Sequence, residues 1–137
     1  MANLSEILSN KILVLDGAMG TMVQTYKLNE QDFRGDRFIS HSHDLKGNND
    51  ILCLTQPDIV EEIHQAYFNA GADIIETNTF NATAISQADY DMADYVYEIN
   101  LTAAKIAKKV AASYDDKIRF VAGALGPTNQ TASLSPD

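Results

Sequence analysis

The sequence has few of the residues that mark several common classes of protein. It contains one cysteine, Cys53, and no tryptophan among its 137 residues. This chain alone therefore cannot form an internal disulfide or a zinc cluster of several thiolates. No apolar run approaches the ~18 residues that a membrane helix needs, and the first ten residues lack the basic and then apolar pattern of a signal peptide. We therefore expect a cytoplasmic protein that binds no membrane.

Positive charge is also scarce. Ten Lys and Arg residues stand against nineteen Asp and Glu residues, which gives a formal net charge of −9. Such a surface repels a phosphate backbone, so we do not expect nucleic acid as a partner. The apolar share of 45% and the charged share of 21% are ordinary for a globular protein, and the length fits a single domain.

Three short segments have the continuous apolar character of parallel strands that are buried on both faces. They are Ile12–Asp16, Asp73–Thr77 and Arg119–Leu125. Each is followed by residues typical of turns, so the sequence predicts three strands whose carboxyl ends lead into loops.

Two long helices are predicted between these strands, because apolar residues recur with a period near 3.6 in Asp58–Ala70 and from about Asp94 to Ser113. Thr55 is expected to cap the first of them, and Gly71 to end it in the left-handed conformation.

Shorter helices are expected at Leu4–Ser9 and Thr21–Tyr26. The alternation of strand and helix indicates an α/β fold. Residues Lys27–Leu54 show no sustained period, and we expect a long loop there. A loop of that length inside a compact domain is usually functional.

The residues that follow the first predicted strand suit an amino-acid ligand, because ligands of α/β folds bind beyond the carboxyl ends of the strands. Asp16 can pair with an ammonium group, and the backbone N–H groups of a glycine-containing loop at the start of a helix can bind a carboxylate. No G-x-G-x-x-G pattern is present, and the charge of Asp16 would repel a pyrophosphate. A helix-capping aspartate beside turn glycines fits the same spacing. The candidate residues are Asp16, Gly17, Ala18, Met19 and Gly20.

Short polar residues follow the second predicted strand, at Glu76, Thr77 and Asn78. Buried hydroxyl and amide groups need hydrogen-bond partners, so this cluster indicates a polar network, a ligand or both. A solvated turn is the alternative.

The histidines and the cysteine give weaker signals. His41 and His43 form an H-x-H pair, but they lie in a polar segment rather than at the end of a strand. A solvated loop is therefore favoured over a pair of metal ligands. His64 lies on a predicted helix and is interpreted as a surface or packing residue, and Cys53 as a small buried apolar residue.

Five segments, taken together and in order, resemble the homocysteine S-methyltransferase family, and in particular its cobalamin-dependent branch. The resemblance extends from about Ile7 to Asp137. The segments are Ile12–Met22 (ILVLDGAMGTM), Asp32–Gly35 (DFRG), Asp44–Asp50 (DLKGNND), Gly71–Phe80 (GADIIETNTF) and Gly126–Asn129 (GPTN), the last followed by Thr131-Ala132-Ser133.

The resemblance implies a (β/α)8 TIM barrel, of which residues 1–137 would form an incomplete N-terminal portion of about three βα units, because such barrels typically have ~250 residues. It also implies zinc, held by three cysteines, and cobalamin in the full-length protein. Cys53 matches none of those cysteines, so they are expected beyond Asp137 and no metal ligand is expected here. The isolated segment is therefore expected to be inactive.

The resemblance further implies homocysteine as the substrate, with cobalamin- and folate-binding domains in the same full-length chain. Asp16 would bind the substrate ammonium, the loop from Gly17 to Gly20 would lie near its carboxylate, and Glu76, Thr77 and Asn78 would lie on the substrate side of the second strand. Because a three-stranded sheet leaves an open edge, the segment is expected to self-associate.

Three other functions remain open at this point. One is a cobalamin-independent methyltransferase acting on homocysteine or another thiol. Another is a metal-dependent TIM-barrel hydrolase that uses His41 and His43. The last is a non-enzymatic interaction module, which the polar strand ends disfavour.

Overall fold

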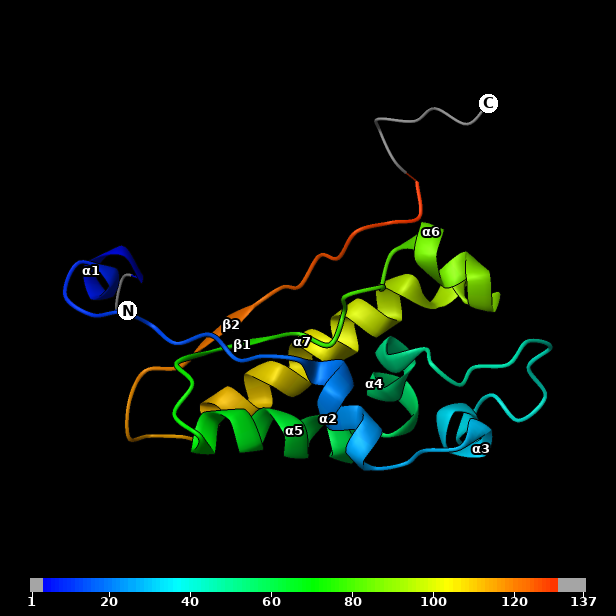
Figure 1. Ribbon diagram of the computed structural model, residues 1–137, viewed down its shortest axis with the longest axis horizontal. Helices are drawn as coiled ribbons and strands as arrows, with labels where there is room; N and C mark the ends of the chain where they lie inside the picture. The colour runs from blue at the N-terminus through cyan, green and yellow to red at the C-terminus, as the bar shows by residue number, and fades with distance from the viewer. Residues whose placement is uncertain (1–3, 131–137) are drawn as a thin grey trace.

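The computed structural model describes residues 4–130 of the chain. At its centre lies a two-stranded parallel sheet formed by β1 (Ile74–Glu76) and β2 (Phe120–Ala122), with Ile75 opposite Val121. Helices α5 (Pro57–Asn69) and α7 (Val96–Ala112) cover the sheet (Figure 1). The α/β fold and the parallel pairing are confirmed, while the number of βα units stays a prediction.

Both long helices form close to their predicted bounds, because each has an apolar stripe that can be buried. Phe68 of α5 packs with Ile75 of β1 and with Ala107 and Val110 of α7 in one apolar cluster. Gly71 follows α5 with a φ of 110°, which confirms the predicted left-handed end.

The predicted cap of α5 is wrong. Gln56 precedes the helix, and no side chain caps it. Thr55 is instead the last residue of α4 (Leu52–Thr55), where its hydroxyl donates to the carbonyl of Ile51 at 3.4 Å. Because the hydroxyl of Thr55 is hydrogen-bonded within α4, it does not cap α5.

The first predicted strand, Ile12–Asp16, is reduced to a single parallel bridge between Leu15 and Ile74. The segment pairs with β1 along one side, where the N–H groups of Asp73 and Ile74 donate to the carbonyl of Val14. Its other side has no partner among residues 4–130, and 89% of the surface of Ile12 is exposed. The prediction of a strand buried on both faces is therefore wrong for this segment.

The buried carboxylate of Asp73 fixes the N-terminal end of the segment Ile12–Asp16. Asp73 accepts hydrogen bonds from Lys11 and Lys117, each at 2.7 Å, and from the N–H of Val14 at 3.1 Å. Hydrogen bonds from Lys11, Lys117 and Val14 hold the pKa of Asp73 well below its ordinary value. This network ties the first segment, β1 and the chain before β2 together at the end opposite to the strand tips.

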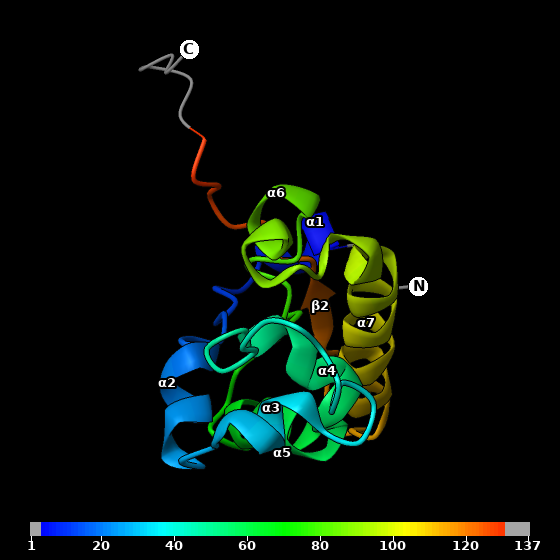
Figure 2. The same ribbon diagram turned by 90° about the vertical axis from the view of Figure 1, so that its right-hand side faces the viewer.

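The segment Lys27–Leu54 is folded rather than a long irregular loop, so that expectation is wrong. It contains α3 (Glu30–Arg34) and the 3-10 helix η1 (Asn49–Ile51), and it runs into α4. The buried side chains that it adds to the larger core are Phe33, Phe38, Leu45, Ile51, Leu52 and Cys53. Elements of three to five residues are too short to give a sustained period. Figure 2 looks onto the end of the molecule where α3 lies against α4 and α4 lies against α5.

The remaining elements are short. α1 spans Leu4–Leu8 and α2 spans Met19–Thr25, the second beginning two residues before the predicted start. α6 (Ala84–Gln87) and the 3-10 helices η2 (Ala88–Tyr90) and η3 (Ala93–Tyr95) lead into α7.

Of the resemblance motifs, Thr131-Ala132-Ser133 lies outside the described residues. None of the helices in the described range is long and apolar enough to cross a membrane.

Candidate functional site

A cavity of about 300 Å³ lies at the carboxyl ends of the first segment and β1. All eight residues predicted from the sequence line it, so the structure brings them to one place. Five further residues that the sequence reasoning did not select complete its wall: Asn49, Asp50, Phe80, Asn81 and Ala124.

Asp16 lies where the bridge of the first segment ends. The N–H of Glu76 donates to both carboxylate oxygens of Asp16, at 3.1 Å each. Burial, partly opposed by this hydrogen bond and reinforced by the charge of Glu76, raises the pKa of Asp16 to about 6. Asp16 is therefore mostly ionised at neutral pH, but its negative charge is poorly compensated by the protein.

The loop after Asp16 offers unpaired hydrogen-bond donors. Helix α2 begins at Met19, and no side chain caps it. A helix leaves its first N–H groups without intrahelical acceptors. Four consecutive residues that line the cavity are Gly17, Ala18, Met19 and Gly20. In the part of the chain that the structure describes, their N–H groups have no protein acceptor.

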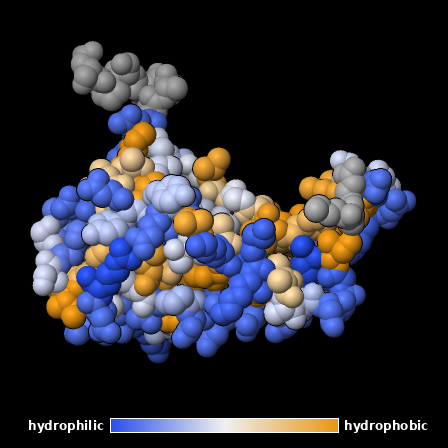
Figure 3. All heavy atoms as spheres, turned by 180° about the vertical axis from the view of Figure 1, so that it is seen from behind, coloured by the Kyte–Doolittle hydropathy of each residue, from blue (hydrophilic) through white to orange (hydrophobic). Residues whose placement is uncertain are grey.

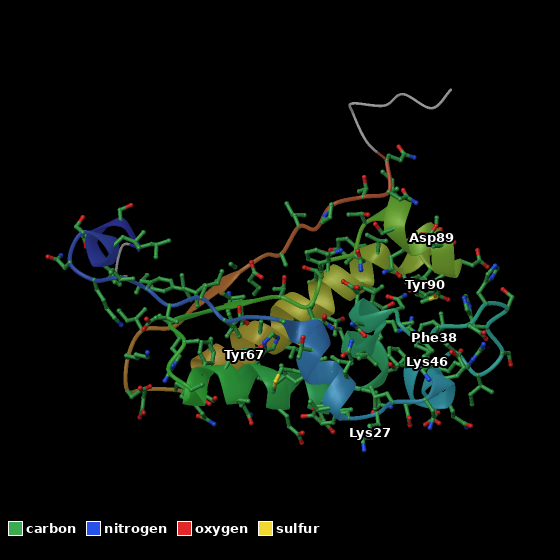
Figure 4. The ribbon with its side chains drawn as sticks, in the orientation of Figure 1. Lys27, Phe38, Lys46, Tyr67, Asp89 and Tyr90 are labelled. Atoms are coloured by element: carbon green, nitrogen blue, oxygen red, sulfur yellow. The ribbon has the colours of Figure 1, made fainter. Side chains whose placement is uncertain are left out.

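Tyr67 of α5 holds the loop after Asp16 in place. Its hydroxyl donates to the carbonyl of Ala18 at 3.3 Å, and a Cβ on Gly17 would lie 3.7 Å from the same hydroxyl. Figure 4 shows Tyr67 on α5 close to α2. This hydrogen bond fixes the side of the loop that faces away from the free N–H groups.

Thr77 contributes to the cavity wall, but its hydroxyl is already engaged. Thr79 donates to the carbonyl of Ala124 at 2.9 Å, and the N–H of Ala124 donates to Thr77 Oγ1 at 3.1 Å. Because the hydrogen of Thr79 is used, Thr77 must donate to Thr79 Oγ1, 2.7 Å away. The closed ring of hydrogen bonds joins the ends of β1 and β2, so Thr77 shapes the cavity rather than offering a donor to a ligand.

Asn78 is also held within the protein. Its amide donates to the carbonyl of Asn49 at 2.7 Å and to Cys53 Sγ at 3.6 Å. Burial raises the pKa of the Cys53 thiol to about 12. Cys53 is therefore a neutral core residue, as predicted, and Asn78 ties the tip of β1 to η1.

Asp50 is the acidic residue among the five cavity residues that were not predicted from the sequence. Its carboxylate is buried and accepts the N–H of Asn81 at 3.0 Å. Burial, only partly opposed by that hydrogen bond, raises its pKa to about 6. Asp50 ends the motif Asp44–Asp50, which does not follow a predicted strand, so the strand-end rule does not place it at the cavity. With Asp16 and Glu76, three carboxyl groups line the cavity and no lysine or arginine does, which favours a cationic group in the ligand.

The three histidines lie elsewhere. His41 and His43 do not line the cavity, and the structure places Asp91 beside them. His64 is fully buried on α5, which agrees with its interpretation as a packing residue.

The family model described as homocysteine S-methyltransferase matches residues 13–137. The chain belongs to the homocysteine S-methyltransferase family. Two solved structures of the homocysteine methyltransferase MmuM from Escherichia coli are similar to it, the oxidized form with a TM-score of 0.70 and 24% identity and the metallated form with 0.69 and 22%. Likeness at these identities concerns the fold. The alignments cover 90% of this chain but 40% and 41% of those structures, so the chain spans about two fifths of their length.

The family resemblance implies a zinc ion held by three cysteines. This chain does not supply those ligands. Zinc is held by deprotonated thiolates, whereas the single cysteine here is buried, bonded to Asn78 and neutral. The residues present therefore do not fit a thiolate-bound zinc ion.

Proposed function

We propose that the cavity binds homocysteine by its charged amino-acid end, as part of a homocysteine S-methyltransferase. One observation carries this proposal: the same small cavity is lined by Asp16, a carboxylate with little compensating charge, and by four residues with free N–H groups, from Gly17 to Gly20. An α-amino acid has an ammonium group and a carboxylate on one carbon atom, so it can satisfy both at once.

Asp16 would bind the ammonium group in its ionised form, and Asp50 and Glu76, which line the same cavity, would add negative potential. The free N–H groups would bind the substrate carboxylate, as helix N-termini bind anions. Thr77 and Asn78 would keep the cavity in shape through the bonds between β1, β2 and η1. The expectation that Asp16 only caps a helix is disfavoured, because its carboxylate bonds to β1 and not to α2.

We further propose that the complete protein is a cobalamin-dependent methionine synthase, with folate- and cobalamin-binding domains in the same chain. The support is the segment Asp44–Asp50, part of the resemblance to that branch, which contributes Asn49 and Asp50 to the cavity. Cobalamin, when bound to such a protein, supplies the methyl group. The zinc ion that activates homocysteine would be held by three cysteines beyond Asp137 in the full-length protein.

Calorimetric titration of homocysteine into the chain tests the binding proposal. We expect Asp16→Asn to weaken binding about ten- to a hundredfold, because a charge-assisted hydrogen bond contributes roughly 1.5–3 kcal/mol. Asp115→Asn is the matched control, since Asp115 is exposed and lies before β2, away from the cavity.

The ligand can be varied in the same experiment. 4-Sulfanylbutanoate keeps the thiol and the carboxylate but lacks the ammonium, so it should bind weakly to the wild type and equally weakly to Asp16→Asn. If it bound as tightly as homocysteine, or if both variants bound like the wild type, the assignment of Asp16 would be wrong.

The methyl donor is tested on the complete protein. Homocysteine methylation with methylcobalamin, and not with a sulfonium donor, would support the cobalamin-dependent branch. The opposite result would place the protein among the cobalamin-independent methyltransferases and leave the homocysteine site unaffected.

A further inference from the structure

A second group of chemically active side chains lies outside the cavity. His41 and His43 come from the segment between α3 and η1, and Asp91 follows η2, about fifty residues later in the chain. Each residue offers one ligand atom, and the three atoms lie within 4.8 Å of one another. His41 is half-buried, and the other two side chains are exposed.

The ring of His41 is held by one of its two nitrogen atoms. Its Nε2 lies 2.8 Å from the carbonyl of Tyr90, and because a carbonyl only accepts, Nε2 must carry the hydrogen. The unprotonated atom of the neutral ring is then Nδ1. Metal-binding histidines usually donate their other N–H to a carbonyl or carboxylate in this way. The edge of the ring also packs against buried Phe38, with 6.2 Å between centroids.

The backbone that carries both histidines is fixed. The guanidinium of Arg34 donates to the carbonyl of His41 at 2.7 Å and to that of His43 at 2.9 Å. Arg34 is itself paired with Glu30 at 2.6 Å. The loop can therefore hold the two imidazoles without being ordered by a ligand.

Asp91 is placed by a turn of its own. It ends η2 in the left-handed conformation, with a φ of 55°, and its N–H donates to the carbonyl of Ala88. Its carboxylate lies 3.8 Å from His43 Nδ1 and 3.4 Å from the hydroxyl of Ser42. Because Tyr90, the partner of His41, directly precedes Asp91, one turn positions both sides of the cluster.

We propose that His41, His43 and Asp91 form a binding site for a divalent transition-metal ion such as Zn²⁺ or Ni²⁺, separate from the homocysteine cavity. Two imidazoles and a carboxylate favour these ions over Mg²⁺ or Ca²⁺, which prefer oxygen ligands. Zinc–ligand bonds of about 2.0–2.2 Å place two ligand atoms roughly 3–4 Å apart, so small rotations of the exposed His43 and Asp91 side chains would complete the site. Water would occupy the remaining positions.

Titration of Zn²⁺ alone into the chain by calorimetry, in a buffer that does not bind metals, tests the proposal. We expect one ion per chain, and a loss of affinity of about tenfold or more in His41→Ala, His43→Ala and Asp91→Asn. Asp89→Asn removes the same charge two residues away and should leave the affinity unchanged. Asp89 is exposed and is labelled with Tyr90 in Figure 4. Circular dichroism of each variant checks that it is folded.

Paramagnetic Ni²⁺ gives an independent readout. At substoichiometric amounts it should broaden the amide signals of residues 41–43 and 91 before any others. The proposal is overturned if the double variant His41→Ala/His43→Ala binds Zn²⁺ as tightly as the wild type, if Asp89→Asn loses as much as Asp91→Asn, or if the broadening appears elsewhere.

Discussion

Asp16 illustrates, at the scale of a single residue, how a binding group can reduce the stability of the fold that carries it. Burial raises its pKa to about 6, so the folded protein holds the proton more tightly than the unfolded chain does. At neutral pH the ionised carboxylate is therefore less favourable in the folded state than in the unfolded state. A ligand ammonium would relieve this cost.

Replacing Asp16 by Asn should therefore stabilise the free protein at pH 8 while weakening homocysteine binding. The destabilising effect of a raised pKa is complete above about 6 and disappears as the pH falls toward the unfolded value of 3.8. We expect a higher melting temperature for the variant at pH 8 and a smaller difference at pH 5. Thermal melts at both values check this, and a variant that is less stable at pH 8 would contradict it.

Homocysteine binding should weaken as Asp16 takes up a proton. With a pKa of about 6 for Asp16, the affinity should change little between pH 7 and 8 and fall about tenfold by pH 5, because only the ionised form pairs with an ammonium. Titrations across this range measure the effect. Asp16→Asn should show a much flatter profile, and an equally steep one would assign the pH dependence to another group, such as Asp50.

At the scale of elements, helix α5 combines a regular apolar stripe with one buried titratable side chain. His64 has no exposed surface, and neither ring nitrogen has a hydrogen-bond partner within residues 4–130. Burial, slightly opposed by the charge of Glu61, lowers its pKa to about 4. The folded protein is therefore more stable with a neutral His64 than with a protonated one.

The free energy of unfolding should consequently decrease as the pH falls through the range in which unfolded His64 takes up a proton. A shift from 6.5 to about 4 corresponds to a loss of about 2 kcal/mol between pH 7 and pH 5. Urea unfolding of the wild type and of His64→Leu at both values isolates this contribution, since the other groups titrate in both proteins. If the two proteins lost the same amount, His64 would not be the cause.

The elements that could be predicted from the sequence are those whose local pattern agrees with their surroundings. The stripes of α5 and α7 and the end of α5 at Gly71 meet this condition. The segment Ile12–Asp16 has the composition of a buried strand, but how much of it pairs and is buried depends on its neighbours in the fold, which composition does not record. The short helices between Lys27 and Leu54 are stabilised by tertiary packing of residues such as Phe33 and Leu45.

The same reasoning applies to the site. Strand ends in an α/β fold lie together, so the pattern after Leu15 and Ile75 was enough to select the eight predicted residues that line one cavity. Asp50 could not be selected in this way, because it reaches the cavity from η1 through the fold of the preceding segment. The meeting of Asp91 with His41 and His43 likewise depends on a turn that no local pattern connects with them.

At the scale of the whole molecule, apolar surface remains exposed on the central sheet and its extensions. Ile12 and Leu125 are 89% and 88% exposed, and Val14 is 54% exposed. β2 pairs with β1 along one edge, and its other edge has no partner in the described part of the chain. Figure 3 shows apolar residues at the surface, including some on the projecting part of the molecule that carries α1 in Figure 1. Exposed strand edges and apolar patches of this kind favour association.

We therefore expect the 137-residue chain to self-associate in solution. Sedimentation equilibrium should show an average mass above 15.0 kDa that rises with concentration. Ile12→Lys combined with Leu125→Lys should reduce the association, whereas Leu101→Lys, an exposed leucine on α7, serves as the control. A monomer at all concentrations, melting in one cooperative transition, would contradict this expectation.

The central claim is that Asp16 and the loop that follows it hold the amino-acid end of homocysteine, and a crystal structure of the chain with homocysteine bound tests it most directly. We predict that the ammonium lies about 2.7–3.2 Å from the carboxylate of Asp16 and that the substrate carboxylate accepts N–H groups from Gly17 to Gly20. Homocysteine bound outside this cavity, or bound there with its ammonium away from Asp16, would contradict the claim.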